Sequence, residues 1–214
     1  LPSHKSLVDY IILSKVFYRA EVPVPTIAAG DNLNFFPLGP LLRKAGAFFI
    51  RREFKGDRLY GAVVDAYVRR LILEGTSLEF YLEGGRSRTG KLHPPKLGLL
   101  SMVVDAAIGV KKKVYFCPIS VGYERFVEED SYAEELAGGD KTKEDVRGLV
   151  AAVEKIAGRY GRISVQFGEP LTLEGELAEI EPSARLDALT PAKRRRLVTR
   201  LAFRVMNEIN QVSA

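Results

Sequence analysis

The sequence predicts an α/β protein whose central sheet, mostly parallel or mixed, is covered by helices on both faces. Short apolar runs of strand length alternate along the chain with longer segments of helical periodicity. Few hairpin-type turns separate the apolar runs, which favours parallel neighbours. The composition, 46% hydrophobic and 28% charged, is typical of a globular protein, and 214 residues form one domain, 1–214, with a sizeable core.

The first half of the chain contains the elements on which this prediction mainly depends. Apolar residues at helical spacing predict a helix that starts at about Ser6, with Ser6 as its N-cap. Pro23 and Pro25 make the following segment a stiff, extended connector. The next predicted elements are a strand at 26–29, a turn and short helix at 32–44, a buried strand at 47–50, a helix at 59–73 and a strand at 77–82.

The second half continues the alternation of helices and strands. Its predicted elements are a loop at 84–95, a helix at 97–108, a strand at 114–120, a surface excursion at 124–142, a helix at 143–160, a strand at 163–167 and a last helix from Thr190. Ligands of such sheets bind at the carboxyl ends of the strands. Arg51, Arg52 and the loop that begins at Gly84 fall at such strand ends.

Composition and charge exclude some classes of protein. The single cysteine, Cys117, excludes an internal disulfide and suits a reducing compartment, and there is no apolar run long enough to span a bilayer and no signal peptide. The net charge is +5, with six basic and two acidic residues in 43–58 and four basic residues and no acid in 84–100. This clustering favours an anionic ligand over evenly solvated charge. Because a motif begins as early as His4 and the chain opens with Leu1 rather than Met, we expect further residues before Leu1.

His4 and Asp9 form the first candidate motif. If His4 lies in the loop before the helix, the carboxylate of Asp9 in the first turn can reach back to one ring nitrogen, which leaves the other nitrogen free to accept a proton. Such a pair is a general base for activating a hydroxyl group. The alternative is a histidine beside a first-turn acid that the helix dipole favours, and the pair alone favours this alternative. The second histidine, His93, lies in a loop and is expected to face solvent.

The glycine-rich loop at 84–91 resembles two known motifs, the P-loop that binds nucleotide phosphates and the nucleophile elbow of hydrolases. It matches neither of them. Leu92 stands where a P-loop needs Ser or Thr, and Thr89 stands where a nucleophile elbow needs Gly. The loop instead presents Arg86 and Arg88 at alternate positions, which place both side chains on one side of an extended segment. Two guanidinium groups suit a phosphate, although salt bridges to acidic surface residues are the alternative. Of the adjacent Arg51 and Arg52, at most one should face the same pocket.

With these motifs in place, the chain resembles the glycerol-3-phosphate acyltransferase family, in its bacterial membrane-associated branch. The four sequence blocks of that family occur in order, at 4–9 (His-x-x-x-x-Asp), 46–52, 81–90 (with Gly-Gly-Arg-Ser-Arg) and 117–124. The resemblance extends to about residue 173. It implies an acyltransferase catalytic domain with the fold of that family, and relatives usually have a further N-terminal region.

The resemblance implies transfer of an acyl group from acyl-CoA or acyl-acyl carrier protein to the sn-1 hydroxyl of glycerol 3-phosphate, giving lysophosphatidic acid. His4 would be the base and Asp9 would orient it. Residues implied in substrate binding are Arg52, Glu83, Gly84, Arg86, Ser87, Arg88 and Pro118, of which Pro118 would border the acyl site. No metal, cofactor or nucleic acid is expected. Lysophosphatidate or dihydroxyacetone phosphate are alternative acceptors, and a non-catalytic lipid-phosphate-binding module is the alternative class.

Amphiphilic substrates imply a peripheral protein at the cytoplasmic face of the inner membrane. Two segments are candidates for membrane contact. The helix at 190–210 carries an apolar face beside several arginines, which suits an interfacial helix but suits equally, and more commonly, a helix that covers a sheet. The segment 35–38 (Phe-Phe-Pro-Leu) is the other candidate, as a membrane wedge, an acyl-chain wall or part of the core.

Overall fold

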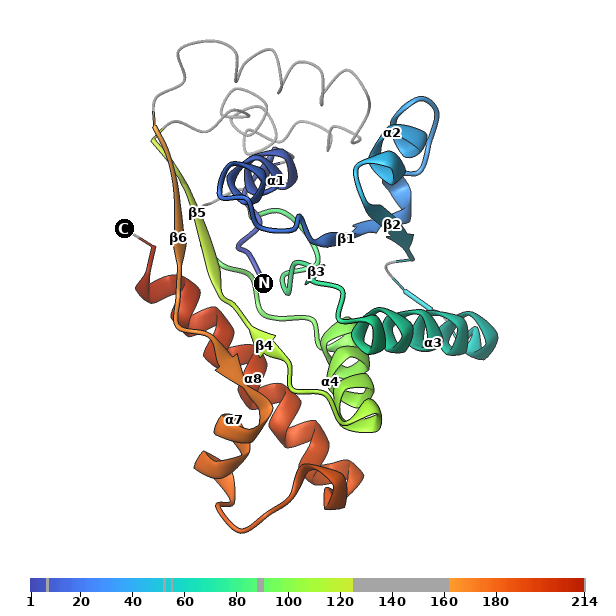
Figure 1. Cartoon of the computed structure of the whole chain (residues 1–214), viewed down its shortest axis with the longest axis vertical. Coiled ribbons are helices and arrows are strands. Elements are labelled where there is room, and N and C mark those ends of the chain that lie inside the picture. The colour runs from blue at the N-terminus through green and yellow to red at the C-terminus, as the bar shows by residue number, and fades with distance from the viewer. Residues whose placement is uncertain (7, 52, 55, 88–90, 125–161, 214) are drawn as a thin grey trace, which may run out of the picture.

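The computed structural model describes residues 1–6, 8–51, 53–54, 56–87, 91–124 and 162–213. Its elements are α1 (Asp9–Arg19), β1 (Thr26–Gly30), η1 (Asp31–Leu33), α2 (Leu38–Lys44), β2 (Ala47–Ile50), α3 (Arg58–Glu74), β3 (Leu78–Glu79), α4 (Gly98–Val110), β4 (Tyr115–Phe116), β5 (Ile119–Tyr123), β6 (Ile163–Phe167), β7 (Leu171–Thr172), α7 (Leu173–Ile180), η2 (Leu186–Ala188) and α8 (Pro191–Gln211) (Figure 1). The predicted α/β class is confirmed. The excursion and helix predicted at 124–142 and 143–160 lie, apart from Glu124, outside the described residues.

The strands form one parallel sheet and two antiparallel pairs. The parallel sheet has the order β2-β1-β3, while β4 pairs with β7 and β5 pairs with β6 in antiparallel fashion. Alternate residues of the parallel sheet face opposite layers, since Ala28 and Ile50 pack toward the core formed with α3 and α4, whereas Ala29 and Phe49 pack toward η1 and α2. The mixed strand directions and helices on both faces agree with the predicted architecture.

Two predicted strands differ from the observed ones, and one observed helix was not predicted. The strand expected at 77–82 pairs with β1 only through Leu78 and Glu79, because the chain then leaves the sheet to form a turn in which the N–H of Gly84 bonds to the carbonyl of Tyr81. The strand expected at 114–120 is interrupted at Cys117-Pro118, where proline has no N–H to donate. Helix α7 was not predicted from its Pro-containing surroundings, although Thr172 caps it by accepting from the N–H of Gly175.

The first helix begins later than predicted. It starts at Asp9 with Val8 at the N-cap position, so the prediction of Ser6 as the cap is wrong. The carboxylate of Asp9 accepts the backbone N–H groups of Lys5 and Ser6, which holds these residues in a turn before the helix. The hydroxyl of Ser6 accepts the N–H of Val8 within that turn. His4 therefore lies in the loop, as the general-base interpretation required.

Helix α8 packs along β5 and against α4 and α7, and it covers the core (Figure 1). Its apolar face is buried, including Leu197, Val198, Leu201, Ala202, Val205, Met206 and Ile209. Burying each large aliphatic side chain contributes about 1.5–3 kcal/mol. On its polar face, Arg194 pairs with Asp105, and Arg200 pairs with the buried carboxylate of Glu176. The covering-helix interpretation is thus confirmed. Within the described residues, no helix is both long and apolar enough to cross a membrane.

Candidate active site

The carboxylate of Asp9 is fully buried and organises the first motif. Its Oδ2 accepts the Nδ1–H of His4 at 3.0 Å and the backbone N–H groups of Lys5 at 2.8 Å and Ser6 at 2.9 Å. Its Oδ1 accepts the hydroxyl of Tyr123 from β5. Four donors surround this carboxylate, and its bond to Nδ1 fixes the direction of the imidazole ring. Because Nδ1 carries the proton in this arrangement, Nε2 is the atom that can accept one.

The backbone of His4 is held on both sides by residues of the third sequence block, at 81–90. Its N–H donates to Oε1 of Glu83 at 2.8 Å, and its carbonyl accepts the N–H of Ser87 at 2.7 Å. The other oxygen of Glu83 accepts the N–H of His93 at 2.9 Å, and the hydroxyl of Ser87 donates to the carbonyl of Lys91. Glu83 and Ser87 are both buried, and their polar groups are directed at backbone. The geometry makes them positioning residues for His4.

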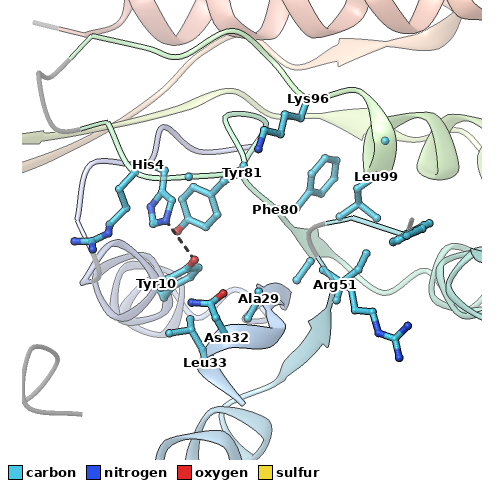
Figure 2. Close-up of a pocket in the computed structure, with 18 residues that line it drawn as sticks. His4, Tyr10, Ala29, Asn32, Leu33, Arg51, Phe80, Tyr81, Lys96 and Leu99 are labelled. Atoms are coloured by element: carbon cyan, nitrogen blue, oxygen red, sulfur yellow. Dashed lines mark hydrogen bonds between the residues drawn. The ribbon is translucent and has the colours of Figure 1, made fainter. Parts of the chain in front are cut away.

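Two tyrosines that sequence reasoning missed surround the imidazole. The ring of Tyr81 lies 4.2 Å from that of His4 between centroids, and the ring of Tyr10 lies 5.4 Å from it, edge-on. The hydroxyl of Tyr10 is 3.4 Å from Nε2 of His4, as the dashed line in Figure 2 marks. This contact is long for an O–H···N hydrogen bond. A substrate hydroxyl that approaches closer would therefore form the better bond to Nε2.

Glu79 is a second buried carboxyl group near the motif. Burial raises its pKa to about 7, with the charge of Asp9 adding to the effect, while the hydrogen bond from Tyr81 and the N-terminal ammonium oppose it. Its Oε1 accepts the hydroxyl of Tyr81 at 2.9 Å. Burial also raises the pKa of Tyr81, so that hydroxyl stays protonated and acts as the donor. Glu79 thereby helps to hold the ring that packs on His4.

The raised pKa of Glu79 makes stability depend on pH. Between the ordinary pKa of 4.5 and about 7, the folded protein retains a proton that the unfolded chain has lost. The free energy of unfolding should therefore fall as pH rises through this window, by about 3 kcal/mol in total. In Glu79→Gln, which can still accept from Tyr81, this contribution should be missing, so the stability of wild type relative to the variant should fall as pH rises from 5 to 8 in urea unfolding. Glu74 is exposed, so the control variant Glu74→Gln should keep the pH dependence of wild type. An unchanged slope in Glu79→Gln would contradict the assignment.

A cavity of about 420 Å³ adjoins the imidazole. Residues from several elements line it: His4, Tyr10, Ala28, Ala29, Gly30, Asn32, Leu33, Ile50, Arg51, Phe54, Phe80, Tyr81, Gly84, Gly85, Arg86, Lys96, Gly98 and Leu99 (Figure 2). The cavity lies where β1, β2 and β3 end, as expected for a parallel sheet. It combines an apolar wall with a basic rim, so it suits a ligand with an anionic end.

The predicted site residues fall into three groups. His4, Gly84 and Arg86 line this cavity, with Asp9 behind His4. Glu83, Ser87 and Pro118 are not among its lining residues. Arg52 and Arg88 lie outside the described part of the chain. Arg51 does reach the cavity, although its guanidinium also bonds to Asp57 at 3.1 Å and stacks on Tyr60. Cationic Lys96 lines the cavity as well and was not predicted from the sequence.

Pro118 lies near a second cavity. It is buried, and its carbonyl accepts the N–H of Gly168 at 2.9 Å. Its neighbours Cys117 and Ile119 line a cavity of about 440 Å³ that also contains many apolar residues, among them Phe17, Val103 and Phe116. Phe80 lines both cavities. The two cavities are therefore adjacent, with Phe80 between them.

The chemistry of the first cavity follows from these contacts. An imidazole whose Nδ1 is bonded to a buried carboxylate can take a proton from a hydroxyl group that enters the cavity. Arg86 and Lys96 line the same cavity and supply positive charge to it. In the described residues, no group of three or more His, Cys, Asp or Glu side chains is arranged to hold a metal ion. The His4–Asp9 pair together with Arg86 and Lys96 can support proton transfer beside an anion.

Comparison with known proteins gives a consistent result over the whole chain. A family model described as "Acyltransferase" matches residues 1–122, and one described as "Glycerol-3-phosphate acyltransferase C-terminal region" matches 132–214. Proteins named glycerol-3-phosphate acyltransferase from Shewanella sp. (strain ANA-3) and Shewanella oneidensis are 42% identical to the chain, and one from Pseudoalteromonas translucida is 41% identical. Each match covers 100% of this chain and 27% of the relative, so the chain spans about a quarter of their length.

Proposed function

Because the chain belongs to the acyltransferase family, we propose that it transfers a fatty acyl group from an acyl thioester to the sn-1 hydroxyl of glycerol 3-phosphate, giving lysophosphatidic acid. The observation that carries the proposal is the buried His4–Asp9 pair beside a cavity that Arg86 also lines. The names of the relatives support glycerol 3-phosphate as acceptor. The donor is acyl-CoA or acyl-acyl carrier protein, and no further cofactor takes part.

The reaction proceeds by direct attack of the acceptor. The substrate hydroxyl gives its proton to Nε2 of His4 while its oxygen attacks the thioester carbonyl. A carbon–oxygen bond forms and the carbon–sulfur bond breaks. The proton then passes from His4 to the departing thiolate, which restores the free base. Asp9 stabilises the imidazolium that exists between these two proton transfers.

Binding of the phosphate contributes through orientation. A phosphate held at Arg86 and Arg88 directs the glycerol hydroxyl toward His4, and general-base catalysis supplies a factor of about 10²–10⁴ once the hydroxyl is in place. Fixing two reactants in a productive geometry can account for about 7–11 kcal/mol of the barrier. In this proposal Arg52 binds the same phosphate. The acyl chain occupies the neighbouring apolar cavity beside Pro118, since both cavities meet at Phe80.

The protein works as a peripheral enzyme at the cytoplasmic face of the inner membrane, because its donor and product are amphiphilic. The turn into α2 supports membrane contact, since Phe36 is 87% exposed and Leu41 is 63% exposed. These side chains follow η1, which contributes Leu33 to the wall of the cavity. The proposed membrane contact is thus close in sequence to one wall of the cavity.

Arg86→Ala tests the contact between the protein and the phosphate. Loss of one charge-assisted hydrogen bond costs about 1.5–3 kcal/mol, so KM for glycerol 3-phosphate should rise by about 10- to 150-fold with a smaller change in kcat. Steady-state kinetics at saturating donor measure both constants. Arg70→Ala on the exposed face of α3 is the matched control and should behave as wild type. An unchanged KM in Arg86→Ala would remove Arg86 from the binding site.

The acceptor is identified by a product assay. The purified protein is incubated with labelled acyl-CoA or acyl-acyl carrier protein and with glycerol 3-phosphate, dihydroxyacetone phosphate, lysophosphatidate or glycerol. We expect efficient transfer to glycerol 3-phosphate and little to glycerol, which lacks the phosphate. Preferential transfer to lysophosphatidate or dihydroxyacetone phosphate would show that this compound, and not glycerol 3-phosphate, is the acceptor. Binding of these phosphates without any transfer would instead indicate a non-catalytic lipid-phosphate-binding module.

A further inference from the structure

Lys96 differs from Arg51, another cation that lines the cavity beside His4, in how its charge is used. Arg51 bonds to Asp57 and stacks on Tyr60, so much of its guanidinium is engaged in the protein itself. The ammonium of Lys96 forms no ion pair with any residue that the structure describes. In Figure 2 it points toward the side of the cavity where Tyr81 and His4 lie, whereas Arg51 extends away from them.

The position of Lys96 is set by its backbone and by the third sequence block. Its N–H donates to the carbonyl of Leu82 at 2.7 Å, and three residues earlier the N–H of His93 bonds to Glu83. The segment that carries Lys96 is thus attached to the same residues that hold His4. This shared attachment holds the backbones of Lys96 and His4 to the same sequence block.

Gly84 gives the side chain of Lys96 its route into the cavity. A Cβ atom at position 84 would lie 2.6 Å from Cδ and 3.1 Å from Cε of Lys96, so the lysine stem occupies the space that a side chain would need. Gly84 also has φ +61°, a left-handed conformation that favours glycine. The glycine turn therefore does more than present Arg86, because it lets a lysine from outside the block lie across it.

We propose that Lys96 binds the phosphate of the acceptor together with Arg86 and thereby selects phosphorylated over neutral acceptors. This inference rests on the proposed function and adds a residue to it. An ammonium group is a compact charge with three donors that can follow a phosphate through small movements, whereas a guanidinium fixes it in one plane. A phosphate bound by Lys96 and Arg86 would lie in the cavity that His4 also lines, which leaves the glycerol hydroxyl directed toward Nε2.

Kinetics of Lys96→Met and Lys96→Arg test the inference. Methionine keeps the apolar stem over Gly84 and removes the charge, so KM for glycerol 3-phosphate should rise about 10- to 100-fold while kcat changes less than threefold. Arginine should recover part of the loss. The matched control is Lys91→Met. Lys91 is an exposed lysine of the same segment that does not line the cavity, so the KM of this variant should resemble that of wild type. A wild-type KM in Lys96→Met would overturn the inference.

Direct titration separates this inference from the proposed function. Glycerol 3-phosphate and inorganic phosphate are titrated calorimetrically into wild type, Lys96→Met and Lys91→Met. Binding that is weakened at least tenfold only in Lys96→Met supports the assignment even if wild type transfers no acyl group, in which case the proposed function alone fails. Equal binding by all three proteins, or no phosphate binding by wild type, would refute the role of Lys96. Thermal unfolding establishes that the variants are folded.

Discussion

Replacing His4 with alanine is expected to lower the rate of acyl transfer by a factor of about 10²–10⁴ and to leave the protein folded. The imidazole is the proton acceptor in the proposed reaction, and its Nε2 is the ring nitrogen not engaged with Asp9. Its backbone contacts to Glu83 and Ser87 do not require the side chain, so they persist in the variant. The rate is measured from the formation of labelled lysophosphatidic acid at saturating concentrations of both substrates.

The chain offers a control for this experiment in its other histidine. His93 is exposed, and among the residues that the structure describes its one hydrogen bond is from its backbone N–H to Glu83, so His93→Ala should retain the wild-type rate. Turnover in a folded His4→Ala protein at more than a tenth of the wild-type rate would exclude His4 as the base. An equal loss in both variants would point to general damage of the loop rather than to lost catalysis.

Asp9→Ala is expected to reduce both stability and activity. The carboxylate is buried and receives hydrogen bonds from His4, from the backbone of Lys5 and Ser6 and from Tyr123. Removing it leaves these donors without their acceptor, which should lower the free energy of unfolding by about 3–5 kcal/mol. Denaturant unfolding at pH 7 measures the loss. Acyl transfer should fall by a factor of up to about 10⁴, no more than in His4→Ala, because the imidazole loses both its orientation and its charge partner.

Asp9→Asn separates these two contributions. The amide oxygen can take the place of Oδ2 toward His4, Lys5 and Ser6, while the amide NH₂ can donate to the hydroxyl of Tyr123. This variant should therefore unfold within about 1 kcal/mol of wild type, since neutral hydrogen bonds replace charged ones. Its kcat should still fall by about 10²-fold, because the imidazolium loses a charged partner. Wild-type kcat in Asp9→Asn would show that the charge of Asp9 is not used in catalysis.

Local pattern predicted most of the fold that surrounds the site. Strands β1 and β2 are short apolar runs ended by Gly30 and Arg51, and α3 carries an Asp57 cap, so both types of element have local signals. The shortening of β3 has no such signal, because it results from the departure of the chain toward the cavity at Phe80. The antiparallel pairing of β5 with β6 joins segments that are distant in sequence, and periodicity alone does not specify a partner.

The site was predictable where its residues are close in sequence. His4 and Asp9 are five positions apart, and the distance between Nδ1 and Oδ2 agrees with the expected pair. The contacts of Tyr81 with His4 and of Lys96 with Gly84 depend on how separate segments pack, so no spacing rule identifies them. For the same reason, the attachment of Glu83 and Ser87 to the backbone of His4 appeared only in the structure. A glutamate or serine next to a glycine turn gives no sign of whether it faces a ligand or the chain.

The most direct test of the central claim is a crystal structure of the protein with glycerol 3-phosphate bound. We expect a glycerol hydroxyl within about 3.2 Å of Nε2 of His4, either directly or through one water molecule. The phosphate should lie at the wall formed by Gly84, Arg86 and Lys96. A phosphate bound away from this wall, or a glycerol unit beyond the reach of Nε2, would contradict the account.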